Sequence, residues 1–248
     1  MILKSFAPDP ERDLPLIRQY AKAELNPEDV YTCRILLADN EIDRDDEQFS
    51  PEALRQMAEL YPGKPGIVDH EWKAKNQFAR VYRAEAAPAA GRKNGVGEPL
   101  WELTADVYIL RAGNEKRIAD IEGGILREVS VGVRGARQVC SVCGAVRWDC
   151  EHHAGQEYGG KQCWFRYDKI EDVYEFSFVA VPAQRGAGVR KCYDPRDPAN
   201  EFLRRLEAGA YDRDERVLSA AAQGIRAAAL RDGQRKALLE ENAKFLPP

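Results

Sequence analysis

The strongest chemical pattern in the chain is a cluster of cysteine and histidine residues between positions 140 and 153. Cys140 and Cys143 form a Cys-x2-Cys pair, and Cys150 and His152 follow closely. Zinc favours four such ligands in a tetrahedron, and a Cys-x2-Cys pair supplies two of them. The spacing therefore predicts a structural zinc site bound by Cys140, Cys143, Cys150 and His152.

The ligand set stays open at this point, because His153 or Cys163 could replace one of the four. Free buried cysteines that lie close by chance are the simpler alternative, but two of the three histidines in the chain share this segment. A nuclease of the His-Asn-His type also combines zinc-binding cysteines with catalytic histidines. Such enzymes usually carry two Cys-x2-Cys pairs, and this chain has one.

Ser130 is the second residue that could do chemistry, because its surroundings predict a strand with a rigid face. Three valines alternate with three other residues, Ser130, Gly132 and Arg134. The valines would face the core, and Ser130 would stand on the opposite face beside a glycine that leaves the backbone approachable. An ordinary strand serine is the simpler interpretation of this segment alone.

His70 and Glu175 could complete a catalytic set with Ser130. A nucleophilic serine needs a base that titrates near neutral pH, and His70 is the one histidine outside the cluster. Glu175 lies within the apolar run 173–181, which predicts a central strand, and an unpaired carboxylate there would be costly. A salt bridge to an arginine would also explain Glu175, and a structural role would explain His70.

The elements that must position these residues are short strands and helices. Further strands are predicted over 30–37, 78–83 and 101–109, and helices over 14–25, from Ser50 and from Asn114. Residues 86–99 predict a mobile loop because they are rich in Ala, Gly and Pro. Residues 39–47 predict a solvated acidic loop, which lacks the register of a calcium-binding EF-hand.

Composition limits the classes of partner. The chain has 248 residues, a net charge of −4 and a pI near 5.6, which argues against broad binding to nucleic acid. We also expect no membrane span and no secretory leader, because long apolar runs are missing from the sequence. These features favour a cytosolic protein with reduced thiols.

The chain is expected to have a domain over 1–197, with the zinc-binding insertion at about 138–163, and a helical tail over 198–248. From about Pro198, apolar residues recur at helical spacing between charges of both signs. The tail contains no histidine or cysteine. We therefore expect it to serve assembly and not the active site.

Several segments resemble, in the same order, the prohead (head maturation) proteases of tailed phages, which are relatives of the herpesvirus assembly protease. The similarity covers about residues 30–190 and is carried by 41–45 with 49–54, 69–72 with 76–81, 129–132 and 174–183. The cysteine insertion resembles one found in some members. The resemblance implies an α+β fold: a mostly antiparallel β-barrel with flanking helices.

The resemblance also implies a serine endopeptidase with Ser130 as nucleophile and His70 as base. The third member would be an acid or a histidine, and Glu175 fits by position. Other acids near it in sequence stay open as alternatives, namely Asp168, Glu171 and Asp172. Backbone amides after Pro182 are the expected oxyanion donors.

The partners implied by the resemblance are those of capsid maturation. Substrates would be the scaffold protein, the major capsid protein and the protease itself, inside the prohead assembling in the host cytoplasm. A homo-oligomer is compatible with this role. The rival interpretation is a catalytically inactive, zinc-stabilised capsid-assembly or scaffold component of the same fold, which would have no need of Ser130, His70 and Glu175 together.

Overall fold

The computed structural model describes residues 8–193 of the chain. Residues Pro10–Cys192 form one compact unit. The predicted boundary between 1–197 and 198–248, and the helical tail predicted over 198–248, lie outside the described residues. Within residues 8–193, none of the helices has the length and apolar character that a membrane span requires.

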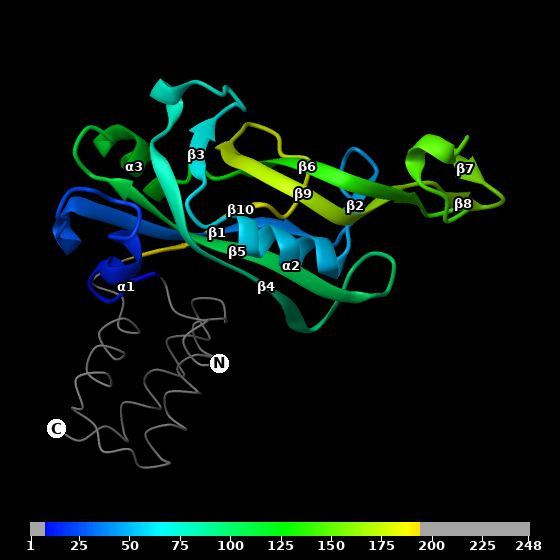
Figure 1. Ribbon diagram of the computed structural model, residues 1–248, viewed down its shortest axis with the longest axis horizontal. Coiled ribbons are helices and arrows are strands. Elements are labelled where there is room, and N and C mark those ends of the chain that lie inside the picture. The colour runs from blue at the N-terminus through cyan, green and yellow to red at the C-terminus, as the bar shows by residue number, and fades with distance from the viewer. Residues whose placement is uncertain (1–7, 194–248) are drawn as a thin grey trace, which may run out of the picture. The chain divides into compact units, whose positions relative to one another are not determined.

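The unit is built on one mixed sheet of eight strands, with a separate two-stranded hairpin (Figure 1). Its neighbouring strands are, in order, β10 (Gly188–Cys192), β1 (Val30–Asp39), β5 (Pro99–Leu110), β4 (Ala79–Lys93), β3 (Pro65–Val68), β9 (Phe165–Phe178) and β2 (Glu47–Phe49). β6 (Val129–Cys140) pairs with β9 outside this path. The β2 and β3 strands run parallel to β9, and the other pairs are antiparallel.

The α+β class is confirmed, but the predicted β-barrel is wrong, because the sheet is not closed. The nearest approach to closure lies between β10 and the residues just before β6. There Glu128 and Gly188 form one isolated bridge, and the Val189 N–H donates to the Arg127 carbonyl oxygen at 2.8 Å. The short β10 strand has its ladder with β1, so one bridge to the β6 side leaves the sheet open.

The helix α2 (Pro51–Leu60) begins where the sequence predicts. The Ser50 hydroxyl caps it by accepting the Ala53 N–H at 3.1 Å. Its buried residues Ala53, Leu54 and Met57 pack with buried residues of the sheet in the main hydrophobic core. Burial of this face fixes α2 against the sheet.

The other two α-helices differ in detail from the prediction. The helix expected over 14–25 is α1 (Pro10–Ile17), which ends eight residues earlier. The α3 helix (Glu115–Glu122) follows Asn114 as expected, but the Asn114 amide donates to the Leu110 carbonyl oxygen at 3.0 Å and does not cap the helix.

The mobile loop predicted over 86–99 is also wrong. β4 continues to Lys93, and β5 begins at Pro99. Within this segment Ala86, Ala87, Pro88 and Lys93 pair with β5, and the register shifts between Pro88 and Lys93. Asn94 closes the turn, because its Oδ1 accepts the Glu98 N–H at 2.8 Å. Ladder hydrogen bonds to β5 thus override the low strand propensity of Ala, Gly and Pro.

The acidic segment 39–47 is less solvated than predicted. Asp39 and Asp43 are buried, and burial raises the pKa of both carboxyl groups despite backbone hydrogen bonds that lower it. Asp43 Oδ1 accepts the N–H groups of Asp45 and Glu47, each at 2.9 Å. These carboxylates therefore order the turn, as Asp side chains often do.

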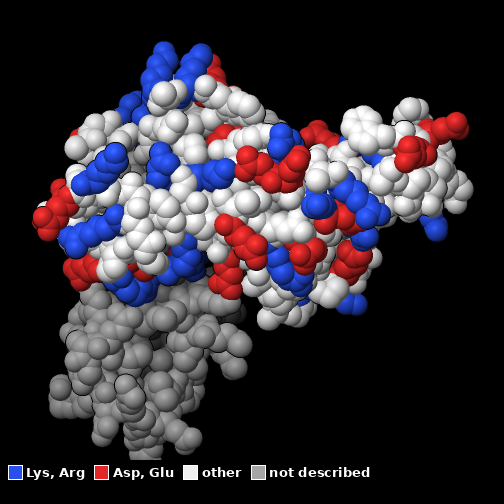
Figure 2. Space-filling view, in the orientation of Figure 1, with Lys and Arg blue, Asp and Glu red and all other residues white. Residues whose placement is uncertain are grey.

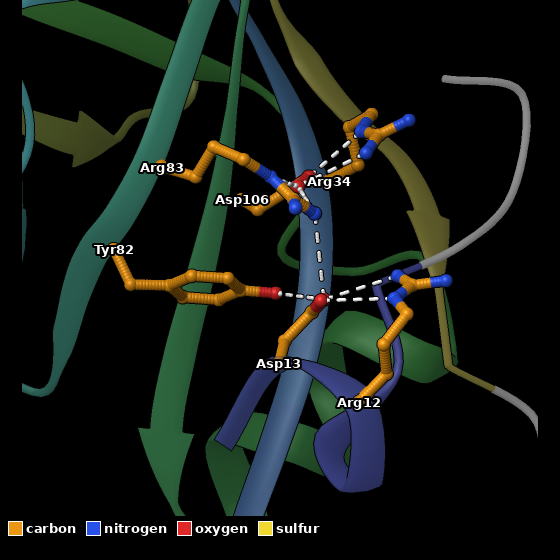
Figure 3. Close-up of polar contacts among 6 residues, drawn as sticks. All are labelled: Arg12, Asp13, Arg34, Tyr82, Arg83 and Asp106. Atoms are coloured by element: carbon orange, nitrogen blue, oxygen red, sulfur yellow. Dashed lines mark hydrogen bonds and ion pairs between the residues drawn. The ribbon is translucent and has the colours of Figure 1, made fainter. Parts of the chain in front are cut away.

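A partly buried polar network ties α1 to the sheet (Figure 3). Its members are Arg12, Asp13, Arg34, Tyr82, Arg83 and Asp106. Asp106 accepts from Arg34 Nε at 2.7 Å and from Arg83, while Asp13 accepts from the Tyr82 hydroxyl at 2.9 Å. Both carboxylates are buried, so each needs these partners to offset the loss of water.

The β6 and β9 strands form a long hairpin that carries the cysteine cluster at its far end (Figure 1). The connection between them contains a 3₁₀ turn, η4 (Arg147–Asp149), and the small hairpin of β7 (Glu157–Tyr158) and β8 (Lys161–Gln162). On the face in Figure 2, positive and negative side chains are interspersed over the described part of the chain.

Candidate active site and metal centre

His70 is held over the end of β9 by its own backbone. It follows β3, which runs parallel to β9 with Ile67 opposite Ser177. Asp69 and His70 both adopt the left-handed conformation, each with φ of 53°. Such backbone costs about 1 to 2 kcal/mol per non-glycine residue and persists where surrounding bonds impose it.

Two hydrogen bonds impose this conformation. The Asp69 N–H donates to the Phe178 carbonyl oxygen at 3.0 Å, and the His70 N–H donates to Ser177 Oγ at 3.0 Å. Both acceptors belong to β9. The turn after β3 is therefore fastened to the strand that carries Glu175.

Glu175 lies within hydrogen-bond distance of His70, as the sequence predicts. His70 Nδ1 is 2.9 Å from Glu175 Oε1. The Glu175 side chain is 3% exposed and the His70 side chain 40%, so the imidazole shields the carboxylate from water. As a carboxylate, Glu175 only accepts hydrogen bonds, which assigns the ring proton to Nδ1 and leaves Nε2 as the basic nitrogen.

Ser130 stands beside this pair. β6 and β9 are antiparallel, with Ser130 directly opposite Ser177 and Gly132 directly opposite Glu175. Residues that alternate on a strand share a face, and opposed residues on paired strands share it too. Ser130 and Glu175 therefore lie diagonally on one face, while Val131 and Val133 pack against the core as expected.

The structure does not join Ser130 to His70 by a hydrogen bond. Among residues 8–193, Ser130 Oγ has no hydrogen bond to the His70 ring. Hydrogen bonds between a nucleophile and its base often tighten only when substrate binds. The structure thus brings His70 and Glu175 together and puts Ser130 on the adjoining strand.

The three alternative acids have other partners. Asp168 accepts from Arg166 Nε at 3.1 Å, and Glu171 pairs with Arg134 at 2.8 Å. Asp172 accepts from Lys64 Nζ at 3.0 Å, a bond that lowers its pKa. Of the four acids considered, Glu175 is the one bonded to His70.

A hollow of about 180 Å³ lies next to the buried carboxylate. Ile67, Trp72 and Tyr174 line it together with Glu175. The rings of Trp72 and Tyr174 are 5.1 Å apart, and Trp72 is 68% exposed. Of His70, Ser130 and Glu175, Glu175 alone lines this hollow. An exposed aromatic wall beside a carboxylate is the kind of surface that receives an apolar group of a ligand.

The segment after Pro182 is fastened to the acidic segment. Arg44 Nη1 donates to the Pro182 carbonyl oxygen at 2.8 Å, and the Arg44 N–H donates to the Ala183 carbonyl oxygen at 3.1 Å. These bonds give the segment a fixed position. An oxyanion role for its amides stays a prediction.

The predicted metal ligands lie close together. The sulfur atoms of Cys140, Cys143 and Cys150 and a ring nitrogen of His152 all lie within 4.8 Å of one another. Cys143 Sγ is 3.5 Å from Cys150 Sγ, and His152 Nδ1 is 3.3 Å from Cys150 Sγ. A tetrahedral zinc site would separate such atoms by about 3.6 to 3.8 Å, so the four residues fit a metal ion.

The two substitute ligands are less well placed. Cys163 Sγ lies 3.7 Å from Cys140 Sγ, yet neither Cys163 nor His153 belongs to the group of four. Two thiols of the group differ in their pKa: desolvation and the thiols of Cys140 and Cys143 raise the pKa of Cys150 to about 11, whereas the pKa of Cys140 is lowered. Burial opposes the ionisation of Cys140, but backbone N–H groups and neighbouring thiols outweigh burial and lower its pKa to about 6. A thiolate is the form that binds metal.

Ser177 is the residue of this site that the sequence reasoning missed. It is fully buried, and its hydroxyl donates to Glu175 Oε2 at 2.6 Å. The available signal was its position two residues after Glu175, which makes the two a polar pair on one face of an otherwise apolar strand.

In comparisons with known proteins, no family model matches the chain, and neither a curated protein nor a solved structure matches it.

Proposed function

We propose that the protein is a serine endopeptidase in which Ser130 is the nucleophile, His70 the general base and Glu175 the group that orients the base. The observation that carries the proposal is the bond between His70 Nδ1 and the buried Glu175 carboxylate, beside a strand serine. A buried carboxylate that holds one imidazole nitrogen leaves the other free to take a proton from a hydroxyl.

The reaction would follow the acyl-enzyme route. Ser130 Oγ attacks the scissile carbonyl carbon while His70 Nε2 takes the hydroxyl proton, and Glu175 stabilises the imidazolium. The C–N bond then breaks, and His70 returns the proton to the leaving amine. Water, activated by the same nitrogen, releases the acyl group and restores Ser130.

The substrates proposed are the proteins of an immature phage capsid: the scaffold protein, the major capsid protein and the protease itself. Support for them comes from the sequence resemblance to prohead proteases, and the action would take place inside the prohead. The aromatic wall formed by Trp72 and Tyr174 is where we propose that the substrate chain binds.

We also propose that Cys140, Cys143, Cys150 and His152 bind a zinc ion, which has a structural role. A closed set of four protein ligands leaves no position for a substrate. Zinc there would hold the end of the β6–β9 hairpin in one conformation, since the connection contains little other regular structure.

Labelling with a fluorophosphonate probe tests the proposal. The wild-type protein should become labelled, and mass spectrometry should locate the adduct on Ser130. Ser130→Ala and His70→Ala should abolish labelling and cleavage of capsid substrates while the fold is retained. Ser141→Ala, an exposed serine, is the matched control and should be labelled normally. A folded protein that neither takes up the probe nor cleaves capsid or scaffold protein would favour the inactive assembly component.

A further inference from the structure

We infer that Ser177 is a positioning residue that fixes the base and its carboxylate relative to each other. The inference rests on the proposed function in one respect, namely that His70 is the base. Its physical content is a closed set of hydrogen bonds among His70, Glu175 and Ser177, which exists whatever the substrate is.

The hydroxyl of Ser177 has both of its roles assigned. It has one proton, which it donates to Glu175 Oε2 at 2.6 Å, and its oxygen accepts the His70 N–H at 3.0 Å. With the bond from His70 Nδ1 to Glu175 Oε1 at 2.9 Å, these contacts form a ring. His70 enters this ring twice, through its backbone and through its imidazole.

The ring restrains two motions that would disturb a base. Both Glu175 oxygens are bonded, so the carboxylate cannot rotate without losing a partner. The His70 N–H donates to Ser177 Oγ within the left-handed turn, so the backbone cannot relax to a more favourable φ without losing this hydrogen bond. Orientation of the imidazole is thereby coupled to a strand residue that has no exposed surface.

Because Ser177 is buried, it is unsuited to act as a nucleophile itself. Ser177 is 0% exposed, and its proton is committed to the carboxylate. Ser130, directly opposite on β6, is partly exposed. One serine of this cross-strand pair is therefore reachable by a substrate, and the other can act only through His70 and Glu175.

The test reads the His70 imidazole directly by proton NMR. In the wild-type protein the hydrogen bonds among His70, Glu175 and Ser177 should protect the Nδ1–H proton of the imidazole from exchange. This proton should give a downfield resonance, which is assigned by its loss in His70→Ala. Ser177→Ala should remove or broaden that resonance. Ser130→Ala, which deletes the same group from the facing position, should keep it. If Ser177→Ala fails to fold, Ser177→Cys, of similar volume with a weaker donor, should weaken the resonance in a folded protein.

Peptide cleavage provides the second readout. Ser177→Ala should lower kcat by about 10- to 100-fold with little change in KM, because a displaced base affects the chemical step more than binding. A wild-type protein without the resonance, or a folded Ser177 variant with an unchanged resonance, would overturn the inference. Loss of the resonance in a protein whose wild type cleaves nothing would instead uphold the positioning role and count against the peptidase.

Discussion

Gly132 lies directly opposite Glu175 across β6 and β9, and a Cβ atom at position 132 would overlap Glu175 Oε1. The atom that would be displaced is the one bonded to His70 Nδ1. The glycine therefore leaves the space that the carboxylate occupies. Backbone conformation is not the reason, because Gly132 is not among the glycines with positive φ.

Gly132→Ala should consequently lower both activity and stability. The methyl group would push the carboxylate off the imidazole and cost about 1 to 3 kcal/mol of unfolding free energy, the usual range for overpacking. Peptide turnover and urea denaturation would measure the two effects. Gly95→Ala is the control, because its nearest neighbour is the flexible end of Glu41. Equal turnover in the two variants would contradict the role given to the glycine.

Glu175→Gln should cost activity without gross unfolding. The neutral amide keeps the size of the side chain but can present an N–H to His70 Nδ1. That would shift the ring proton to Nε2, the atom that we propose acts as the base. We expect kcat to fall by about 10³-fold or more, as for comparable changes in other Ser-His-acid sets. Steady-state kinetics on a capsid-derived peptide, with thermal melting as the control for folding, would decide. Asp172→Asn, which removes an acid bonded to Lys64, should leave kcat near the wild-type value.

Purified protein should contain about one zinc ion per chain. Cys143→Ser should lower the metal content several-fold and speed amide exchange in the connection between β6 and β9 more than in the sheet, since the ligands lie within that connection. Elemental analysis and hydrogen exchange would provide the readouts. Cys192→Ser, outside the cluster, should change neither.

Cys163→Ser decides whether the neighbouring thiol is a ligand. We expect the zinc content to be retained, because Cys163 is not in the group of four. A loss equal to that of Cys143→Ser would exchange Cys163 for one of the proposed ligands.

Asp13→Asn should destabilise the protein in a pH-dependent way. Burial raises the pKa of Asp13. The hydrogen bond and charge of Arg12, the charge of Arg83 and the hydrogen bond from the Tyr82 hydroxyl lower this pKa by more than burial raises it, so the net shift is downward. A depressed carboxyl pKa contributes stability above the unfolded-state value and loses it as pH falls through the folded value. The variant should thus be less stable near neutral pH, by about 3 to 5 kcal/mol, the range for removing one partner of a buried ion pair.

The difference in unfolding free energy between Asp13→Asn and the wild type should become smaller as pH falls below about 4. Urea denaturation between about pH 2.5 and 7 would follow it. Lys116→Ala, which breaks an exposed i,i+4 pair with Asp120, is the control and should change stability little across the range. A difference for Asp13→Asn that is constant with pH would exclude the carboxylate charge as its cause.

The sequence by itself determined features that depend on neighbours in the chain. The alternation around Ser130 predicted a strand with valines toward the core, and Ser50 with Pro51 predicted the start of α2. Ligand spacing alone predicted the four residues that gather at the end of the hairpin. The cost of burying a charge predicted that Glu175 needs a partner.

Tertiary structure decided what depends on strands far apart in sequence. The open sheet could not be predicted, because closure depends on whether β10 forms a ladder with β6, and only one bridge exists there. Residues 86–99 became strand and turn because β5 supplied hydrogen bonds to them. Ser177 entered the site only because β3 runs parallel to β9 and brings the His70 N–H to its hydroxyl, a contact 107 positions apart that no local pattern encodes.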